Sequence, residues 1–299
     1  MQMEKIEQII DSNLTKKLAR IDLEEQKIVV KYYKNKQNGD SVVHSHPYHE
    51  FVLPITGSEV RYSANGGLYD VGLGDMIYFP TEMYHSGKFN VTGNISERLV
   101  VKINDNLWKD ASQMLDTAQT SWMNGMVILE RDAVTYWNIR GVFDKIAQSV
   151  KAENEFRDKL LLTYVMELQL LIGQIIATEQ IEMPGAQNEL VTRAVNYLQE
   201  HYEEPDLTVT KLAKENFTSR EHLSRVFKEY TMESIHNYLT NLRMQNCRRI
   251  LAEGGTVEDA CNQSGFSNYT SFLKAFQHRY GMSPSEYKKS ARVIERTTK

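Results

Sequence analysis

The chain repeats one pattern twice in its last third, and this repeat constrains the fold more than any other feature. Each copy begins with Thr, passes through small and apolar residues, turns, and then places apolar residues three and four positions apart. The copies lie in Leu207–Tyr230 and Thr256–Tyr280. Apolar residues at this spacing share one face of a helix, and small residues let two helices cross closely. The sequence therefore predicts two helix-turn-helix units.

The segment between the copies, Met232–Gly254, predicts one long helix. Its apolar residues recur on one face, and a Gly-Gly pair at Gly254 and Gly255 is a typical helix end. A rigid helix here would hold the two units at a fixed separation. Because neighbouring major-groove windows on one face of DNA lie about 34 Å apart, the arrangement predicts a chain that reads DNA at two places.

A dense set of residues fills these units and the helix between them. The set comprises Leu212-Ala213, Ser219–Lys228, Arg243, Arg248–Leu251, Gly265-Phe266-Ser267, Phe272, Phe276 and Tyr280–Tyr287. With these residues, the stretch from about Leu190 to Lys289 resembles the DNA-binding domain of the AraC/XylS family of bacterial transcription regulators. The resemblance implies that double-stranded DNA and RNA polymerase are partners, and that activation of transcription is more common than repression.

The second helix of each unit supplies the candidate DNA-binding residues. They are Ser219, Arg220, Glu221, Ser224, Arg225, Lys228, Asn268, Tyr269, Thr270, Lys274 and Gln277. Arg225 is the best candidate for reading a base, because a guanidinium fork pairs with guanine O6 and N7. Lys274 has the matching position in the second unit but lacks the fork. We therefore predict that the first unit carries more specificity, with a solvated helix face as the alternative for each residue; His222 is predicted to pack toward the turn.

Residues 28–103 predict a small β-rich domain. Short segments rich in Val, Ile, Tyr and Phe alternate with turn clusters such as Asn38-Gly39-Asp40 and Asn65-Gly66-Gly67. Many short strands at this spacing are typical of a sandwich or a barrel. The predicted fold class is therefore α+β and multidomain, with a β-barrel and helices followed by an all-α domain that contains the two helix-turn-helix units.

Two histidine-bearing motifs lie within the predicted barrel. One is Gly39-x4-His44-x-His46-x3-Glu50-x6-Gly57, and the other is Gly74-Asp75-x4-Pro80-x4-His85. They resemble the two motifs of the cupin barrel. The first is one residue short between Gly39 and His44. In the second, Glu82 stands where the cupin motif usually has glycine, and Phe89 stands where it ends in asparagine.

The candidate effector pocket consists of His44, His46, Glu50 and His85. Residues at i and i+2 on a strand face the same side, which for His44 and His46 would be the lumen. Imidazoles and a carboxylate suit Zn, Fe, Mn or Ni, so a divalent metal is one alternative. Contacts to a small-molecule effector and a purely structural role are the others, and no cofactor is assigned. His49 breaks the alternation and is predicted to point outward, with no role.

The segments after the barrel predict helices over Asp105–Ala118, Tyr136–Ala152 and Phe156–Thr178. The third is apolar on more than one face, which indicates burial on more than one side. We predict that one side covers the barrel and that another joins a second copy in a homodimer, with an intramolecular core helix as the alternative.

The predicted divisions of the chain follow from these readings. They are an arm (1–27), a cupin-like effector-sensing barrel (28–103), a helical dimerisation region (104–178), a linker (179–188), the tandem helix-turn-helix domain (189–290) and a tail (291–299).

Composition and charge fit this organisation. The chain has 41% hydrophobic and 25% charged residues, only two cysteines, no apolar run of membrane-spanning length and no apolar start typical of a signal peptide. These features predict a cytoplasmic protein. The net charge is −4, but from Asn188 onward 16 Lys and Arg stand against 14 Asp and Glu. The charge distribution therefore favours the C-terminal part as the DNA-binding part.

The sequence thus predicts a DNA-binding transcription regulator that is controlled by a small molecule in the barrel and has no enzymatic activity. The family resemblance favours activation of transcription over repression. One alternative is a metal-dependent cupin enzyme fused to a DNA-binding domain, which would need an open coordination position. Another is a constitutive regulator whose barrel serves only as a scaffold.

Overall fold

The computed structural model describes residues 27–57, 59–89, 95–116, 121–181 and 184–289. The chain forms two compact units, one of Lys27–Arg243 and another that includes Met244 and the residues after it. The division falls within helix α9 (Ile235–Ala252) and not in the predicted linker, residues 179–188. The predicted arm and tail fall almost entirely outside the described residues.

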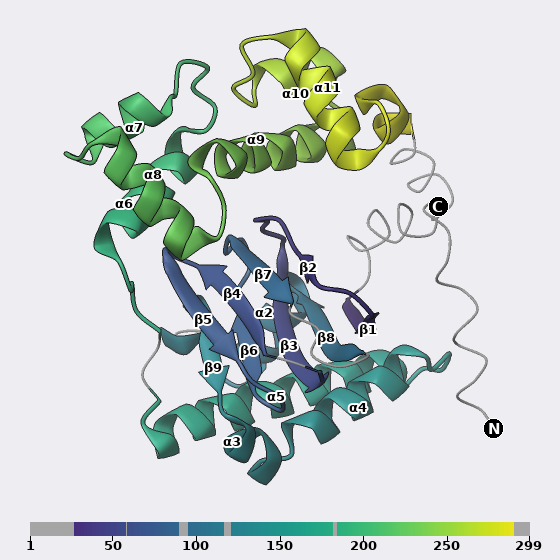
Figure 1. Ribbon diagram of the computed structural model, residues 1–299. Helices are drawn as coiled ribbons and strands as arrows, with labels where there is room; N and C mark the ends of the chain where they lie inside the picture. Colours follow the sequence, from purple (N-terminus) through teal and green to yellow (C-terminus); the bar gives the residue numbers. More distant parts are fainter. Residues whose placement is uncertain (1–26, 58, 90–94, 117–120, 182–183, 290–299) are drawn as a thin grey trace. The chain divides into compact units, whose positions relative to one another are not determined.

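Antiparallel strands of the first unit form two sheets (Figure 1). One sheet has the order β1-β8-β3-β6-β9 and the other β2-β7-β4-β5. The strands are β1 Ile28–Asn35, β2 Gly39–Asp40, β3 Tyr48–Thr56, β4 Val60–Ala64, β5 Gly67–Val71, β6 Met76–Phe79, β7 His85–Phe89, β8 Ser96–Asn104 and β9 Val127–Leu129. This confirms the predicted β-rich region, while its likeness to a cupin stays a prediction.

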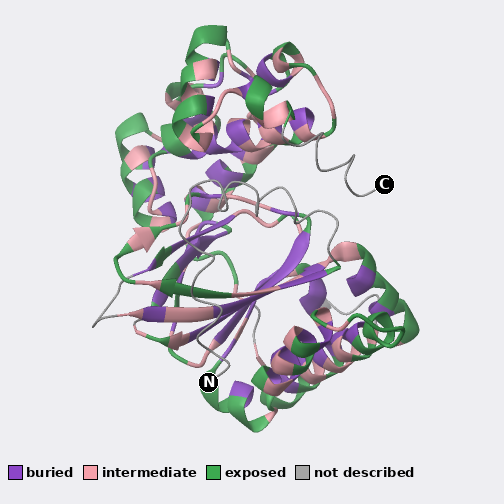
Figure 2. Ribbon diagram, turned by 90° about the vertical axis from the view of Figure 1, so that its right-hand side faces the viewer, coloured by how far each residue is buried: buried purple, intermediate pink, exposed green. Residues whose placement is uncertain are grey.

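The strands β3 and β6 of the five-stranded sheet are buried on both faces (Figure 2). Val52 and Ile77 face the four-stranded sheet, where they pack in one cluster with Tyr62 and Phe89. Their neighbour Phe51 belongs to the cluster on the opposite face, which packs against helices. Because side chains alternate along a strand, β3 and β6 have near-continuous apolar sequences.

Helices cover the outer face of the five-stranded sheet (Figure 1). They are α2 Asp105–Met114, the short 3₁₀ helix η1 Ser121–Asn124, α3 Arg131–Tyr136, α4 Ile139–Val150 and α5 Arg157–Glu179. The helix predicted over Tyr136–Ala152 is α4, which begins only at Ile139 because Asn138 before it adopts a left-handed conformation with φ 51°.

Helix α5 packs its main apolar seam inside the same chain. Leu168 and Ile172 are fully buried in the cluster that also contains Phe51. Because the outer face of the sheet takes up this seam, Leu168 and Ile172 lie on the side of the helix that covers the barrel and cannot form a dimer contact. By length and hydropathy alone α5 is long enough to cross a membrane, with a mean hydropathy of 1.7. Packing against the sheet accounts for its apolar character.

The first helix-turn-helix unit is built from α6 Glu189–His201, α7 Val209–Glu215 and α8 Arg220–Thr231, together with the start of α9. Thr208 caps α7 by accepting a hydrogen bond from the Lys211 N–H. Ahead of α6, Gln187 bonds both backbone groups of Leu68 on the edge strand β5, at 2.9 and 2.6 Å. The segment predicted as a linker is therefore held to the sheet at Gln187.

The second unit contains α10 Val257–Asn262 and α11 Tyr269–Tyr280, followed by helical residues 284–289. Thr256 and Asp259 form a capping box at the start of α10. The core packs Cys247 and Leu251 of α9 against Phe272 and Phe276 of α11. The predicted C-terminal all-α domain with two helix-turn-helix units is thus confirmed.

Candidate DNA-binding helices and a buried histidine cluster

Helix α8 presents a polar, basic face to solvent. The Ser219 hydroxyl caps the helix by accepting from the His222 N–H at 3.1 Å. Leu223 and Phe227 anchor the opposite face and are fully buried. This local geometry leaves Arg220, Glu221, Arg225 and Lys228 exposed, and Ser224 half-buried.

Arg225 lies in a network of exposed side chains on α8. Its guanidinium donates to His222 Nδ1 at 3.2 Å, and it lies 3.7 Å from the Glu229 carboxylate. The prediction that His222 packs toward the turn is wrong: His222 is exposed. Both partners of Arg225 are themselves exposed, so the guanidinium can exchange them for a base edge at small cost.

Helix α11 presents a different set of side chains. Tyr269 is half exposed, and Thr270, Lys274 and Gln277 are exposed. Asn268 is the N-cap of the helix, and its side chain accepts from the Ser271 N–H at 2.9 Å. The structure thus gives Asn268 a local role in addition to the predicted contact with DNA.

The matched pair of helical units decides the family of this region. Residues 212–290 match the family described as a helix-turn-helix domain. This region is an AraC-type helix-turn-helix domain.

Several curated relatives of the AraC-type domain are regulators. The lactose operon transcription activator of Staphylococcus xylosus is 28% identical over 175 residues, which cover 57% of this chain and 61% of that protein. The raffinose operon transcriptional regulatory protein RafR of Pediococcus pentosaceus is 35% identical over 98 residues, 32% of this chain and 35% of that protein. The Msm operon regulatory protein of Streptococcus mutans is 33% identical over 84 residues, 28% and 30% of the two chains. The chain thus spans less than two thirds of these relatives.

A cluster of titratable side chains lies between the two sheets of the first unit. The structure brings together all four residues of the predicted effector pocket, and their potential ligand atoms lie within 4.8 Å of one another. Glu50 lies on β3 and His85 at the start of β7. His44 and His46 were predicted to lie on a regular strand, but they precede β3, and His44 makes only an isolated bridge with His85.

Backbone carbonyls fix the orientation of the three imidazoles. Nδ1 of His44, His46 and His85 donates to a carbonyl two residues away in each case, at 2.9, 3.1 and 2.9 Å. Because a carbonyl only accepts, Nδ1 carries the proton and Nε2 keeps its lone pair in the neutral ring. His85 Nε2 is buried and has no hydrogen-bond partner among the residues that the structure describes. Carbonyl bonds of this kind commonly orient histidine ligands of metals.

Glu50 is the negative centre of the cluster. Its carboxylate contacts His46 Nε2 and lies 2.9 Å from Lys102 Nζ and 3.7 Å from His85 Nε2. Burial by itself would raise the pKa of the Glu50 carboxyl, but Lys102 and His46 hold it well below its usual value. Lys102 lies directly opposite Glu50 on β8. The sequence analysis did not single out Lys102, although a lysine within the apolar segment Leu99–Ile103 was a usable signal.

His44 and His46 are neutral near pH 7. Burial lowers the pKa of His46 to about 4, and Lys102 adds to that effect. Burial also lowers the pKa of His44 well below its usual value. A neutral His46 then directs a lone pair at the Glu50 carboxylate. Two acceptors in contact need a proton or a cation between them, so this donor set fits a divalent metal.

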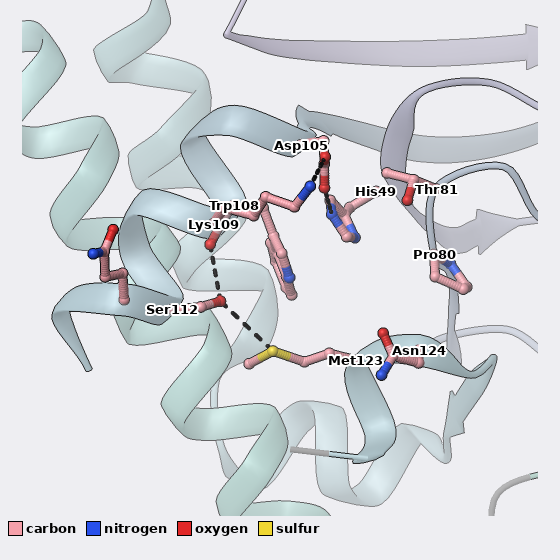
Figure 3. Close-up of a pocket in the computed structure, with 10 residues that line it drawn as sticks. His49, Pro80, Thr81, Asp105, Trp108, Lys109, Ser112, Met123 and Asn124 are labelled. Atoms are coloured by element: carbon pink, nitrogen blue, oxygen red, sulfur yellow. Dashed lines mark hydrogen bonds and ion pairs between the residues drawn. The ribbon is translucent and has the colours of Figure 1, made fainter. Parts of the chain in front are cut away.

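His49 occupies the other face of β3. Its ring stacks on Trp108 with centroids 4.5 Å apart, and Nδ1 lies 2.8 Å from the Tyr78 hydroxyl. His49 points out of the barrel, as predicted, but it is not exposed to solvent. Helix α2 covers this face (Figure 3), so His49 is buried and burial lowers its pKa to about 4.

The histidine cluster adjoins the first helix-turn-helix unit. Val43, next to His44, is buried in the core of α6, α8 and α9, and Tyr84, next to His85, packs against the same core. The Val43 N–H donates to the Glu233 carboxylate at 3.2 Å. The backbone that carries two of the histidines is therefore part of the support of α8.

Proposed function

We propose that the chain is a bacterial transcription activator that binds double-stranded DNA through α8 and α11 and works with RNA polymerase in the cytoplasm. The observation that carries the proposal is a pair of capped helices, each anchored by buried aromatics and each presenting exposed polar side chains. The relatives support it, since they are an activator of a lactose operon and regulatory proteins of the raffinose and Msm operons. No enzymatic activity is part of the proposal.

Selection of duplexes from a random DNA pool by the purified full chain tests this function. We expect enrichment of a sequence whose binding weakens in Arg225→Ala but not in Arg140→Ala, a matched change at an exposed arginine of α4. Failure to enrich any sequence would contradict the proposal. If both variants bind the selected sequence equally well, Arg225 of α8 does not recognise its bases.

We further propose that His44, His46, Glu50 and His85 bind the controlling effector, either directly or through a divalent metal. The three inward-facing Nε2 atoms and the Glu50 carboxylate would hold the metal. When bound, such an ion acts as a Lewis acid that polarises a ligand oxygen. Lys102 neutralises Glu50 in its absence, and it would be available to bind an acidic or hydroxyl group of an effector.

The coupling to DNA is proposed to pass through the neighbours of the histidines. An effector acts only by favouring one arrangement of the chain over another. Movement of His44 or His85 would shift Val43 or Tyr84, which support α8. The Glu233 contact to Val43 gives this coupling a defined hydrogen bond.

Elemental analysis of the purified chain, followed by thermal unfolding with added ZnCl₂, MnCl₂ or NiCl₂, tests the metal. Binding of a metal raises the unfolding temperature. We expect His46→Ala to lose that shift and the effector response while keeping basal DNA affinity. His236→Ala, at an exposed histidine of α9, is the matched control. An unchanged shift in His46→Ala would contradict the assignment.

We propose that the chain is a homodimer and that the outer face of α5 contributes to it. Leu160 and Leu170 are 38% and 51% exposed on this helix. Leu170→Glu should shift the sedimentation of a dimer toward that of a monomer without unfolding it. A variant that sediments as wild type would place the interface elsewhere.

A further inference from the structure

The turn between α7 and α8 exposes an aromatic side chain. Phe217 is 96% exposed, more than any other large hydrophobic residue that the structure describes. It lies two residues before Ser219, the N-cap of α8. A single exposed apolar side chain is common on protein surfaces, so exposure alone indicates no role. The backbone at Phe217, however, sets this residue apart.

Phe217 adopts a left-handed backbone conformation with φ 53°. It ends α7 in a Schellman motif, in which its N–H donates to the Lys214 carbonyl at 3.1 Å and the Thr218 N–H donates to the Ala213 carbonyl at 3.0 Å. Glycine is preferred at this position, because a bulky side chain is strained there. The exposed ring recovers none of that cost by packing within the described chain.

The second helix-turn-helix unit completes its turn with a different arrangement. There Gly265 has the left-handed conformation, with φ 75°. The next residue, Phe266, packs in the core of the unit with its ring centroid 5.5 Å from that of Phe272. In the second unit the aromatic residue therefore stabilises the fold, whereas in the first unit Phe217 is strained and faces solvent. Strain of this kind points to a contact made outside the folded chain.

The surroundings of Phe217 fit a polyanion. Lys214 and Arg220, three positions before and after it, are exposed, and neither forms an ion pair with the residues that the structure describes. Glu215 is the one acidic side chain between them. Arg220 is also the first residue of α8, and the N-terminal residues of a recognition helix contact base edges in the major groove. DNA is therefore the partner that this turn favours.

We propose that Phe217 contacts the methyl group of a thymine in the major groove beside α8. This methyl is the one apolar group on the base edges there, and phenylalanine is among the side chains that pair with it. The arginines of α8 select by hydrogen bonds, so Phe217 would add a preference that they do not supply. The inference rests on the proposed function and adds a residue outside the candidate DNA-binding set.

The length of chain between Phe217 and Arg225 limits where the thymine lies. The turn from Phe217 to Arg220 spans at most about 11 Å, and the helix from Arg220 to Arg225 rises about 7.5 Å. Base pairs are spaced by about 3.4 Å. The thymine should therefore lie within about five base pairs of the one at which Arg225→Ala relaxes the sequence preference.

Replacement of single thymines by deoxyuridine in the selected duplex tests the contact. Uracil keeps the base pair and lacks only the methyl group. We expect one such replacement within this window to weaken binding of the full chain about fourfold, the effect of exposing one buried methyl or methylene group. A selected site with no thymine in the window, or equal binding of every substituted duplex, would overturn the proposal.

A variant of Phe217 connects the methyl group to this side chain. Asparagine tolerates the left-handed conformation but lacks the ring, so Phe217→Asn should bind the thymine and uracil duplexes equally, about as weakly as the wild type binds the uracil duplex. If this variant does not fold, Phe217→Gly replaces it. Tyr136→Ala, at an 82% exposed aromatic residue of α3, is the matched control and should distinguish the duplexes as the wild type does.

The remaining outcomes separate this contact from others. A Phe217 variant that still prefers the thymine duplex would overturn the proposal. So would a variant that weakens both duplexes by the same factor, because that result indicates a contact with the sugar-phosphate backbone. If no duplex is selected, the proposed function fails together with this inference. If binding depends on Arg225 but on neither the methyl group nor Phe217, this inference fails alone.

Discussion

The first and second helix-turn-helix units share their local construction but differ in what completes them. The core of the first includes α6 and two residues from outside the helical domain, Val43 and Tyr84. The core of the second consists of residues from Met244 onward, chiefly Cys247, Phe272 and Phe276. The same helix pair can therefore be stabilised either by its own residues or with a neighbouring sheet domain. The comparison identifies the first unit as the one whose support can respond to events in the barrel.

The exposed faces of the two recognition helices also differ in chemistry. Among the candidate DNA-binding residues, α8 offers two arginines, a lysine and a glutamate, whereas α11 offers a lysine, a tyrosine and neutral side chains. A guanidinium selects guanine by two parallel hydrogen bonds, and an ammonium acts as a point charge. The first unit should therefore contribute more to sequence preference and the second more to general affinity.

Lowering the pH should give the largest difference in stability between two parts of the chain. One is the compact unit Lys27–Arg243, which contains the sheets and the first helix-turn-helix unit, and the other is the compact unit with the second helix-turn-helix unit. His46 and His49, both in Lys27–Arg243, have pKa values lowered to about 4 from an ordinary value of about 6.5. As the pH falls, these histidines take up protons in the unfolded chain before they do so in the folded chain. The free energy of unfolding that they contribute above pH 6.5 is therefore lost between about pH 6.5 and 4. The loss is on the order of 3 kcal/mol for each histidine.

Hydrogen exchange of backbone amides, measured as a function of temperature and pH in the presence of EDTA to remove metals, tests this difference. Amides of the sheets should lose protection at pH 4.5 before those of α10 and α11. Simultaneous loss in both units would mean that their stabilities are not separable by acid.

Removal of an aromatic ring from the core of the second helix-turn-helix unit should lower the stability of that unit by a similar amount. Phe276 is fully buried between α9 and α11, and Phe276→Ala should cost about 3–5 kcal/mol. We expect weakened DNA binding with near-normal protection of the sheet amides. Unfolding of the whole chain at one temperature would instead show that the two units fold as one.

Substitution of the readers should give smaller effects that differ in kind. Arg225→Ala should cost about 1–3 kcal/mol on the selected site and relax preference at one base pair. Lys274→Ala should weaken selected and scrambled duplexes more equally and reduce the dependence on salt. Binding titrations at several salt concentrations separate these effects. If Lys274→Ala relaxes preference more than Arg225→Ala, the ranking of the two units is wrong.

Glu233→Ala should give the smallest effect and affects the first unit alone. It removes the acceptor of the Val43 N–H and of the Asn241 side chain, and should cost about 0.5–1.5 kcal/mol. Effector response should weaken more than basal DNA binding, while the matched change Glu215→Ala at an exposed site of α7 should alter neither. A normal response in Glu233→Ala would exclude this hydrogen bond from the coupling.

Local signals in the sequence determined most of the helical domain. Thr208, Ser219, Thr256 and Asn268 each precede an apolar periodic segment, and each caps a helix in the structure. Caps and helical periodicity act within one or two turns, so a single sequence contains the information needed to place them. The motif spacing also grouped the four residues of the histidine cluster correctly.

The tertiary structure decided what these segments meet. The contact of Val43 with Glu233 joins residues 190 positions apart, and no local pattern specifies such a pair. The pairing of β3 with β8 placed Lys102 opposite Glu50, and the packing of α2 buried His49, which alternation alone predicted to face outward. Periodicity fixes the face of a strand on which a residue lies, but only the assembled layers decide whether that face meets water, a helix or a charge.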